Sequence, residues 1–198
     1  MHKITPMVKS PFFVVTLVSL LCIVLFSLGL DDALAYRRDN ILEGQWWRLL
    51  SGNFLHTNIW HLGMNLAGLW VIVLLFEQHY SAKMLTLLVF TLGLMQGIAL
   101  LIFFPNTLGY VGLSGLLHGL FVYGAVLDIR KGFKTGYLLT LGVILKVIYE
   151  QTYGASHEVT SLIGARVATE AHLIGVVSGF ICLACLYGFN KVKSIRGC

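Results

Sequence analysis

The sequence has little charge. Asp, Glu, Lys and Arg make up 12% of its 198 residues, whereas an ordinary soluble domain carries about 25%. Three prolines and four cysteines exclude a collagen-like chain and a disulfide-rich scaffold. With 57% hydrophobic residues, too few polar side chains remain to cover the surface of a water-soluble globule. The composition therefore indicates a single membrane domain with several spans.

Long runs without charge set the number of spans. A helix needs about 20 apolar residues to cross the hydrocarbon of a bilayer. Because lipid offers backbone groups no partners, spans of this kind are helical. Five uncharged stretches are present, and the longest holds two spans separated by a turn at Pro105-Asn106. We therefore predict an all-α bundle of six transmembrane helices, at residues 11–30, 59–77, 84–104, 113–128, 135–151 and 170–189.

Two of these ranges depend on a further condition. The first range resembles a signal peptide, because Ala33-Leu34-Ala35 after it looks like a small-residue cleavage site. Its apolar run, however, exceeds the length of about 7–15 residues that is usual in signal peptides. We therefore expect the first span, 11–30, to be retained. The fifth range forms a span only if Lys146 reaches a membrane interface. The whole chain, 1–198, is then one membrane domain with a core at about 40–190.

The charges between the spans give the bundle an orientation. One side, with both termini and the loops 77–83 and 128–134, carries nine Lys or Arg and two Asp or Glu. The other side carries five Lys or Arg and seven Asp or Glu. Because Lys and Arg are enriched in cytoplasmic loops, we expect both termini in the cytoplasm. The net charge of +5 then reflects membrane orientation and not nucleic-acid binding.

Ser114 and His172 are polar residues at the outer ends of two predicted spans. Each has a plain structural explanation, an N-cap serine and a histidine that faces water at a helix end. Gly115 and Gly119 follow Ser114, and Gly175 and Gly179 follow His172, so each helix has a face of small residues. If the two faces meet, His172 can take the proton that the Ser114 hydroxyl must lose to act as a nucleophile.

His61 and Asn65 lie four residues apart on the second predicted span and share one helix face. Both are uncharged donors that suit the stabilisation of a developing oxyanion. Hydrogen bonding between helices explains them equally well. No carboxylate lies near them and the seven histidines form no ligand cluster in the sequence, so we predict no metal site. No motif for another cofactor is present either.

His118 is the alternative base, because it follows Ser114 by four residues on the same face. It lies about one turn, roughly 6 Å, deeper, where a proton would have to cross the apolar core. A polar contact in the core is therefore the favoured explanation. Glu170 is two residues from His172 and points to another side of the helix. With no acid placed as a third member, the sequence predicts a serine–histidine dyad.

Together these motifs resemble those of the rhomboid intramembrane serine proteases. The matching residues are Trp46-Trp47-Arg48 in an aromatic, basic first loop that suits the membrane interface, His61-x-x-x-Asn65, Gly112-x-Ser114-Gly115, and Ala171-His172-x-x-Gly175-x-x-x-Gly179. The resemblance implies cleavage of a peptide bond in or near the transmembrane segment of a substrate. It implies that Ser114 is the acylated nucleophile and His172 the general base and then acid. It further implies an oxyanion hole made of the Ser114 backbone N–H, His61 and Asn65.

A narrower resemblance is to the rhombosortases. It rests on the compact six-span size, on the run from Gly112 to Gly119, and on the stretch from Lys146 through Glu150-Gln151 to Gly164-Ala165-Arg166. This resemblance implies a bacterial inner-membrane enzyme whose site opens toward the periplasm. It implies membrane-anchored substrates with a C-terminal Gly-Gly, a transmembrane helix and a basic tail.

Two other classes of function stay open. A catalytically inactive relative would bind transmembrane segments as a scaffold, although such relatives usually lack the serine or the histidine. A transporter would spread polar residues through the middle of the membrane, whereas Ser114, His61 and His172 gather near one surface.

Overall fold

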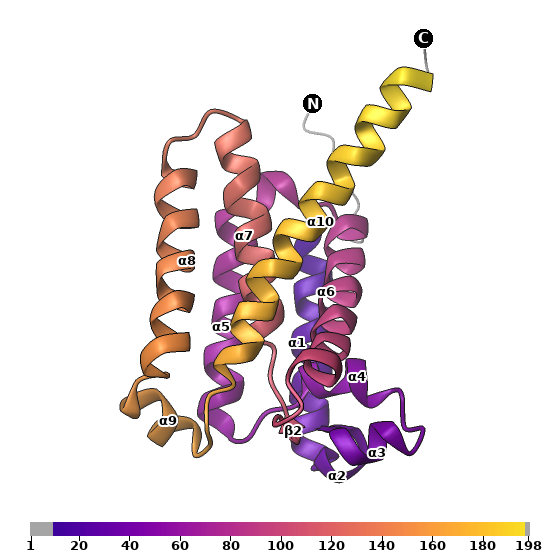
Figure 1. Cartoon of the computed structure of the whole chain (residues 1–198), viewed down its shortest axis with the longest axis vertical. Coiled ribbons are helices and arrows are strands. Elements are labelled where there is room, and N and C mark those ends of the chain that lie inside the picture. The colour runs from indigo at the N-terminus through magenta and orange to yellow at the C-terminus, as the bar shows by residue number, and fades with distance from the viewer. Residues whose placement is uncertain (1–9, 197–198) are drawn as a thin grey trace.

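Six long helices form a bundle in the computed structural model, which describes residues 10–196 of the chain (Figure 1). Each corresponds to one predicted range, and the ends differ by at most two residues, except that α10 ends seven residues later than predicted. The predicted all-α bundle is therefore confirmed. The helices are α1 (Pro11–Leu28), α5 (Ile59–Leu75), α6 (Ala82–Phe103), α7 (Ser114–Arg130), α8 (Thr135–Tyr153) and α10 (Thr169–Arg196).

Not all six helices are equally suited to a membrane. Within the described part of the chain, α1, α6 and the Thr169–Tyr187 part of α10 are each long and apolar enough to cross. A fourth crossing results if α5 and the segment Arg48–Phe54, bent by 93° from it, are taken as one broken span. Helices α5 and α7 have 17 residues each, about 25 Å of helix against a hydrocarbon thickness of about 30 Å.

Short elements gather at the lower end of the bundle in Figure 1, opposite the end at which α10 finishes. Two of them are strands that pair antiparallel, with Tyr36 opposite Tyr110 and Arg37 opposite Gly109. This pairing ties the segment after α1 to the segment before α7. The short elements are α2 (Asp31–Leu34), β1 (Tyr36–Arg37), α3 (Arg38–Leu42), α4 (Arg48–Ser51), η2 (Gly52–Phe54), β2 (Gly109–Tyr110) and α9 (His157–Ile163), while η3 (Glu77–His79) lies between α5 and α6.

Side-chain caps start several of the helices. Ser10, Asn58 and Ser81 stand before α1, α5 and α6, and each side chain accepts a backbone N–H from the first turn of its helix. Such caps supply partners for N–H groups that no helical carbonyl can reach. The Asn58 cap accepts the N–H of His61, and it thereby fixes the end of α5 that carries this histidine.

Glycines allow α7 and α10 to touch. A Cβ atom on Gly119 would lie 3.0 Å from the carbonyl oxygen of Gly175, and one on Gly179 would lie 2.7 Å from that of Gly119. A Cβ on Gly175 would collide with the carbonyl oxygen of Gly115. The two small-residue faces therefore do meet, with no room for a larger residue.

The aromatic segment between α1 and α5 differs from an isolated interfacial helix. Trp46 and Trp47 are 61% and 54% exposed, as expected of residues at a membrane surface. Arg48, however, is buried and donates to the carbonyl oxygens of Ala35 (2.8 Å) and Asp32 (2.7 Å). Helix α4 has only four residues. The arginine therefore holds this loop together from the inside, a role that its position beside two tryptophans did not indicate.

Candidate active site

Ser114 and His172 lie side by side at the lower end of the bundle. Ser114 is the first residue of α7, and its Oγ is 3.1 Å from Nε2 of His172 near the start of α10. Ser114 does not act as an N-cap, because Leu113 occupies that position without a side-chain cap. His172 is 6% exposed, so it does not face water as a helix-end histidine would. The close packing of α7 on α10 thus brings hydroxyl and imidazole within hydrogen-bond distance.

The other nitrogen of His172 contacts a carboxylate. Nδ1 lies 2.8 Å from Oε2 of Glu150, which α8 carries in its last turn. The expectation that no acid lies beside the histidine was therefore wrong. Glu170 points elsewhere, as expected: its carboxylate accepts the hydroxyl of Thr107 (2.6 Å) and pairs with Arg166.

His118, the alternative base, does not contact the Ser114 hydroxyl. Its Nδ1 lies 2.7 Å from the carbonyl oxygen of Ser114, and its ring stacks on that of His172 at 4.2 Å between centroids. Since a carbonyl oxygen only accepts, Nδ1 of His118 carries the hydrogen. Its Nε2 lies 3.2 Å from the ammonium of Lys146. Both ring nitrogens are engaged, and neither is placed to take the proton of Ser114.

Lys146 is the residue on which the fifth predicted span depends. Its ammonium lies 2.7 Å from Oε1 of Glu150, and about half of the side chain is exposed. The lysine thus forms part of a polar group inside one end of the bundle, together with Glu150, His118 and His172. Half of its side chain still reaches the surface, which is how a cation is accommodated in a span.

His61 and Asn65 face the backbone just before Ser114. Gly112 has φ of +125°, and a Cβ at this position would lie 2.8 Å from Nε2 of His61 and 3.4 Å from Nδ2 of Asn65. Gly112 is therefore required both by its conformation and by this close approach. Nδ2 of Asn65 is buried and has no hydrogen-bond partner among the described residues. A buried amide donor without a partner is costly unless a ligand supplies an acceptor.

Thr57 contacts the opposite nitrogen of His61. The backbone N–H of Thr57 is 3.4 Å from Nδ1, and its hydroxyl is 3.1 Å from the same atom. A backbone N–H can only donate, so this contact favours the tautomer with the hydrogen on Nε2, the nitrogen that faces Gly112. The Thr57 hydroxyl also donates to the carbonyl oxygen of Ile163 (2.7 Å), which links the segment before α5 to the end of α9.

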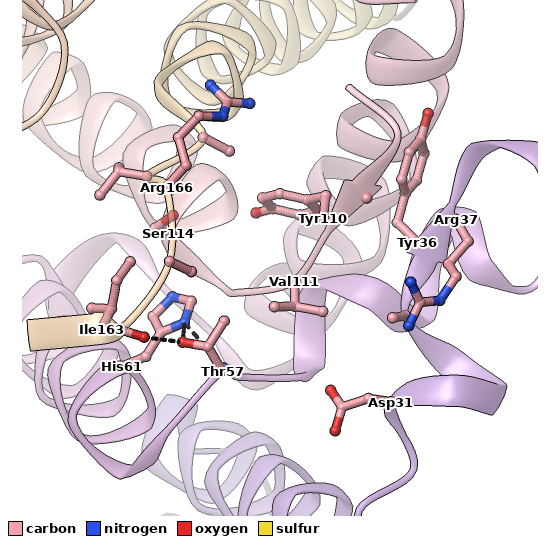
Figure 2. Close-up of a pocket in the computed structure, with 15 residues that line it drawn as sticks. Asp31, Tyr36, Arg37, Thr57, His61, Tyr110, Val111, Ser114, Ile163 and Arg166 are labelled. Atoms are coloured by element: carbon pink, nitrogen blue, oxygen red, sulfur yellow. Dashed lines mark hydrogen bonds between the residues drawn. The ribbon is translucent and has the colours of Figure 1, made fainter. Parts of the chain in front are cut away.

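Ser114 and His61 line a cavity of about 360 Å³. Figure 2 shows both side chains beside Thr57 and Ile163, with Tyr110 across the cavity. Tyr110 donates its hydroxyl hydrogen to the carbonyl oxygen of Gly112, and burial raises the pKa of Tyr110, so the hydroxyl stays neutral. The cavity therefore leaves room for a bound molecule beside Ser114 and His61.

Three potential metal ligands meet behind the serine. Ligand atoms of His118, Glu150 and His172 all lie within 4.8 Å of one another, which the sequence did not indicate. The ammonium of Lys146 already faces two of them, His118 and Glu150. The three side chains and Lys146 therefore form a hydrogen-bonded network, in which His118 and Glu150 each already contact the ammonium.

Comparison with known proteins gives two relatives and a family. The model of the Rhomboid domain family matches residues 43–189. Rhomboid protease GluP of Bacillus subtilis is 30% identical over 146 residues, which are 74% of this chain and 27% of GluP. Rhomboid protease GlpG of Yersinia enterocolitica is 26% identical over 148 residues, 75% of this chain and 51% of GlpG. The chain thus corresponds to about a quarter of one relative and half of the other.

Proposed function

The chain belongs to the rhomboid family, and from this premise we propose that it is an intramembrane serine endopeptidase. Its substrates are membrane-anchored proteins, which it cleaves in or near the transmembrane segment. The observation that carries the proposal is the contact of 3.1 Å between Oγ of Ser114 and Nε2 of His172, beside a cavity. A serine hydroxyl becomes a nucleophile when such a base takes its proton.

Acylation uses these two side chains in sequence. Nε2 of His172 takes the hydroxyl proton while Oγ of Ser114 forms a bond to the carbonyl carbon of the scissile peptide. The C–N bond of the resulting tetrahedral intermediate then breaks, and the imidazolium gives its proton to the leaving amine. The product of this half-reaction is an acyl-enzyme on Ser114.

The oxyanion formed in the first step needs donors. Three are proposed: the backbone N–H of Ser114, Nε2–H of His61 and Nδ2–H of Asn65. The partnerless Nδ2 of Asn65 supports this assignment, because the oxyanion would supply the acceptor that it lacks. The N-terminus of α7 adds a favourable helix dipole at the same place. Each donor of this kind is worth about 10²–10³ in rate.

Deacylation reverses the roles with water in place of the amine. His172 takes a proton from water, the hydroxide attacks the acyl carbon, and the proton returns to Oγ of Ser114 as the ester bond breaks. The cavity of about 360 Å³ that opens beside Ser114 is the route by which we expect water to arrive.

For the substrate, we propose a protein with a C-terminal Gly-Gly, a transmembrane helix and a basic tail, as in the rhombosortase group. Small residues are among those that line the cavity, including Gly109, Ala165 and Ala168. A substrate strand must be extended for attack at its carbonyl, and glycines near the end of a helix favour unwinding. Loss of the tail would release the protein from its anchor.

For the location, we propose the inner membrane of a bacterium, with both termini in the cytoplasm and the cavity open to the periplasm. The charge asymmetry of the loops supports this orientation. The site lies at the lower end of Figure 1, on the side that carries five Lys or Arg against seven Asp or Glu.

The proposed function is tested by cleavage of a Gly-Gly-tailed membrane protein in proteoliposomes. The intact enzyme is expected to release the soluble part, while Ser114→Ala and His172→Ala insert normally and release none. A substrate in which both glycines are replaced by valine tests the Gly-Gly preference separately from the protease assignment. If it is cleaved equally well, the Gly-Gly preference is wrong and the protease assignment stands.

Two outcomes would contradict the protease assignment. Cleavage by Ser114→Ala at the rate of the intact protein would place the chemistry elsewhere. Binding of the tailed substrate without cleavage of it or of other membrane-anchored proteins would identify the chain as an inactive scaffold for transmembrane segments.

A further inference from the structure

Glu150 stands on the inward face of α8. Val143 and Val147 are buried on this helix, and Glu150 follows them at the spacing that keeps a residue on the same face. The side chain of Glu150 is 11% exposed and that of His172 is 7% exposed. A carboxylate is rarely placed inside a bundle unless it has partners. Here the partners are His172 and Lys146.

The carboxylate determines which nitrogen of His172 carries a hydrogen. An ionised carboxylate only accepts, so Nδ1 of His172, at 2.8 Å, donates to Oε2 of Glu150. The lone pair of the neutral ring is then on Nε2, the atom 3.1 Å from the Ser114 hydroxyl. In the opposite tautomer Nε2 would carry the hydrogen and would not accept the proton of the serine.

We propose that Glu150 is a positioning residue that holds His172 in the reactive tautomer and stabilises its imidazolium. The proposal rests on the proposed function, which it deepens by replacing the expected dyad with a Ser114–His172–Glu150 triad. The carboxylate stays ionised throughout, because the proton passes between Ser114, His172 and the leaving group only. Three different helices, α7, α10 and α8, supply the three members.

The neighbours of this triad fit the same role. Lys146 pairs with Oε1, the oxygen of Glu150 that does not contact His172. The ring of His118 stacks on His172 and is kept in place by the Ser114 carbonyl oxygen and by Lys146. His61 lies on the opposite side, in the cavity wall. Among the described residues, these groups and Glu150 are the titratable and charged side chains around His172.

The competing explanation is structural. Lys146 and Glu150 are four residues apart on one helix, and such a pair stabilises a helix by itself. If Glu150 served only to stabilise the helix, removal of Lys146 and removal of the carboxylate would lower kcat equally. If Glu150 acts through His172, removal of the carboxylate lowers kcat far more than removal of Lys146.

The test compares kcat and KM of Glu150→Gln with those of the intact enzyme in proteoliposomes. Gln keeps the size of the side chain but removes the charge, and we expect kcat to fall about 10²–10⁴-fold. KM should change little, because Glu150 does not line the cavity. Glu150→Asp should recover part of kcat, since its carboxylate is one methylene short. Glu158→Gln, which removes an exposed carboxylate on α9, is the matched control and should keep full activity.

Lys146→Met distinguishes the two explanations, with an expected fall in kcat of less than about tenfold. Equal losses for Lys146→Met and Glu150→Gln would overturn the proposal. So would full activity of Glu150→Gln in a preparation where the intact enzyme cleaves substrate and Ser114→Ala does not. Absence of cleavage by the intact enzyme would instead count against the proposed function.

A spectroscopic measurement keeps the proposal testable if Glu150→Gln fails to fold. In the intact protein labelled with ¹⁵N-histidine, the His172 signal, identified by its loss in His172→Ala, should show a hydrogen on Nδ1 in a strong, downfield-shifted hydrogen bond. A neutral His172 with its hydrogen on Nε2 would overturn the proposal.

Discussion

Within residues 10–196, two histidine–carboxylate pairs lie at opposite ends of the bundle, and one of them contacts a serine hydroxyl. At the upper end His79 Nε2 is 2.7 Å from Asp128, with 3% and 9% of the two side chains exposed. At the lower end His172 Nδ1 is 2.8 Å from Glu150, with 7% and 11% exposed. Burial and distance are nearly the same, so neither of them identifies a site.

The difference lies in what surrounds each pair. Asp128 also accepts from the side-chain amide of Gln78 (3.1 Å), and the described residues place no serine or threonine hydroxyl on His79. His172 contacts a hydroxyl at a helix N-terminus, beside a cavity and near a buried donor without a partner. The upper pair joins η3 to α7, whereas the lower pair holds an imidazole nitrogen against a serine hydroxyl.

Replacing the histidine of each pair should change the cleavage rate by very different amounts. His172→Ala should lower the rate of substrate cleavage about 10⁴–10⁶-fold, because the serine loses its base. His79→Ala, measured per folded protein, should cleave at the rate of the intact enzyme. Initial rates in proteoliposomes measure both. A comparable loss per folded protein in the two variants would mean that cleavage needs the upper pair as much as the lower one, and would contradict the assignment of the base to His172.

The proposed oxyanion donors should give the next largest effect. Asn65→Ala is expected to lower kcat about 10²–10³-fold, since an oxyanion in the transition state loses one donor. KM should change much less than kcat. Asn106→Ala, an exposed asparagine in the turn after α6, is the control. A rise in KM of the same size, with kcat unchanged, would instead assign Asn65 to substrate binding.

The contact of α7 with α10 should be sensitive to a single methyl group. Gly175→Ala places a Cβ against the carbonyl oxygen of Gly115, where backbone has to move. We expect a loss of stability of about 1–3 kcal/mol and a larger separation of Ser114 from His172. Thermal unfolding in detergent and cleavage rates measure the two effects.

Gly142→Ala is the matched control for this substitution. Gly142 lies on α8 with no other atom within 4 Å of a Cβ. Alanine is the better helix former, so unfolding should occur at the same or a higher temperature. If Gly142→Ala lost as much stability as Gly175→Ala, the close contact between α7 and α10 would not be the reason that Gly175 is needed.

The smallest effect is expected at the upper pair. Asp128→Asn weakens its bonds to His79 and Gln78 and should lower stability by roughly 1–2 kcal/mol, with cleavage per folded protein unchanged. Asp39→Asn, at an exposed position on α3, should leave the unfolding temperature as it is. A specific loss of cleavage in Asp128→Asn would show that the two ends of the bundle are coupled.

Much of this arrangement follows from local sequence pattern. Uncharged runs give the six helices, because each span must satisfy its own backbone. Glycines at spacings of four indicated two faces able to meet, and these faces do bring Ser114 to His172. Glu170 was excluded from the site on helical geometry, and it does bind Thr107 and Arg166 instead.

Other features depend on which helices become neighbours, which a single sequence does not reveal. Glu150 lies 22 residues before His172, and only the packing of α8 beside α7 and α10 brings it to the imidazole. A local signal existed, since Glu150 continues the face formed by Val143 and Val147. The buried role of Arg48 was likewise hidden, because its partners are carbonyl oxygens of the preceding segment.

Activation of Ser114 by His172 can be measured with a fluorophosphonate probe. Such a probe forms a covalent bond with an activated serine and requires no knowledge of the substrate. We expect mass spectrometry to find the label on Ser114 of the intact protein in membranes, and His172→Ala to be labelled at least about 10²-fold more slowly. Labelling of Ser114 at equal rates in both proteins, or no labelling of Ser114 in the intact one, would contradict this activation.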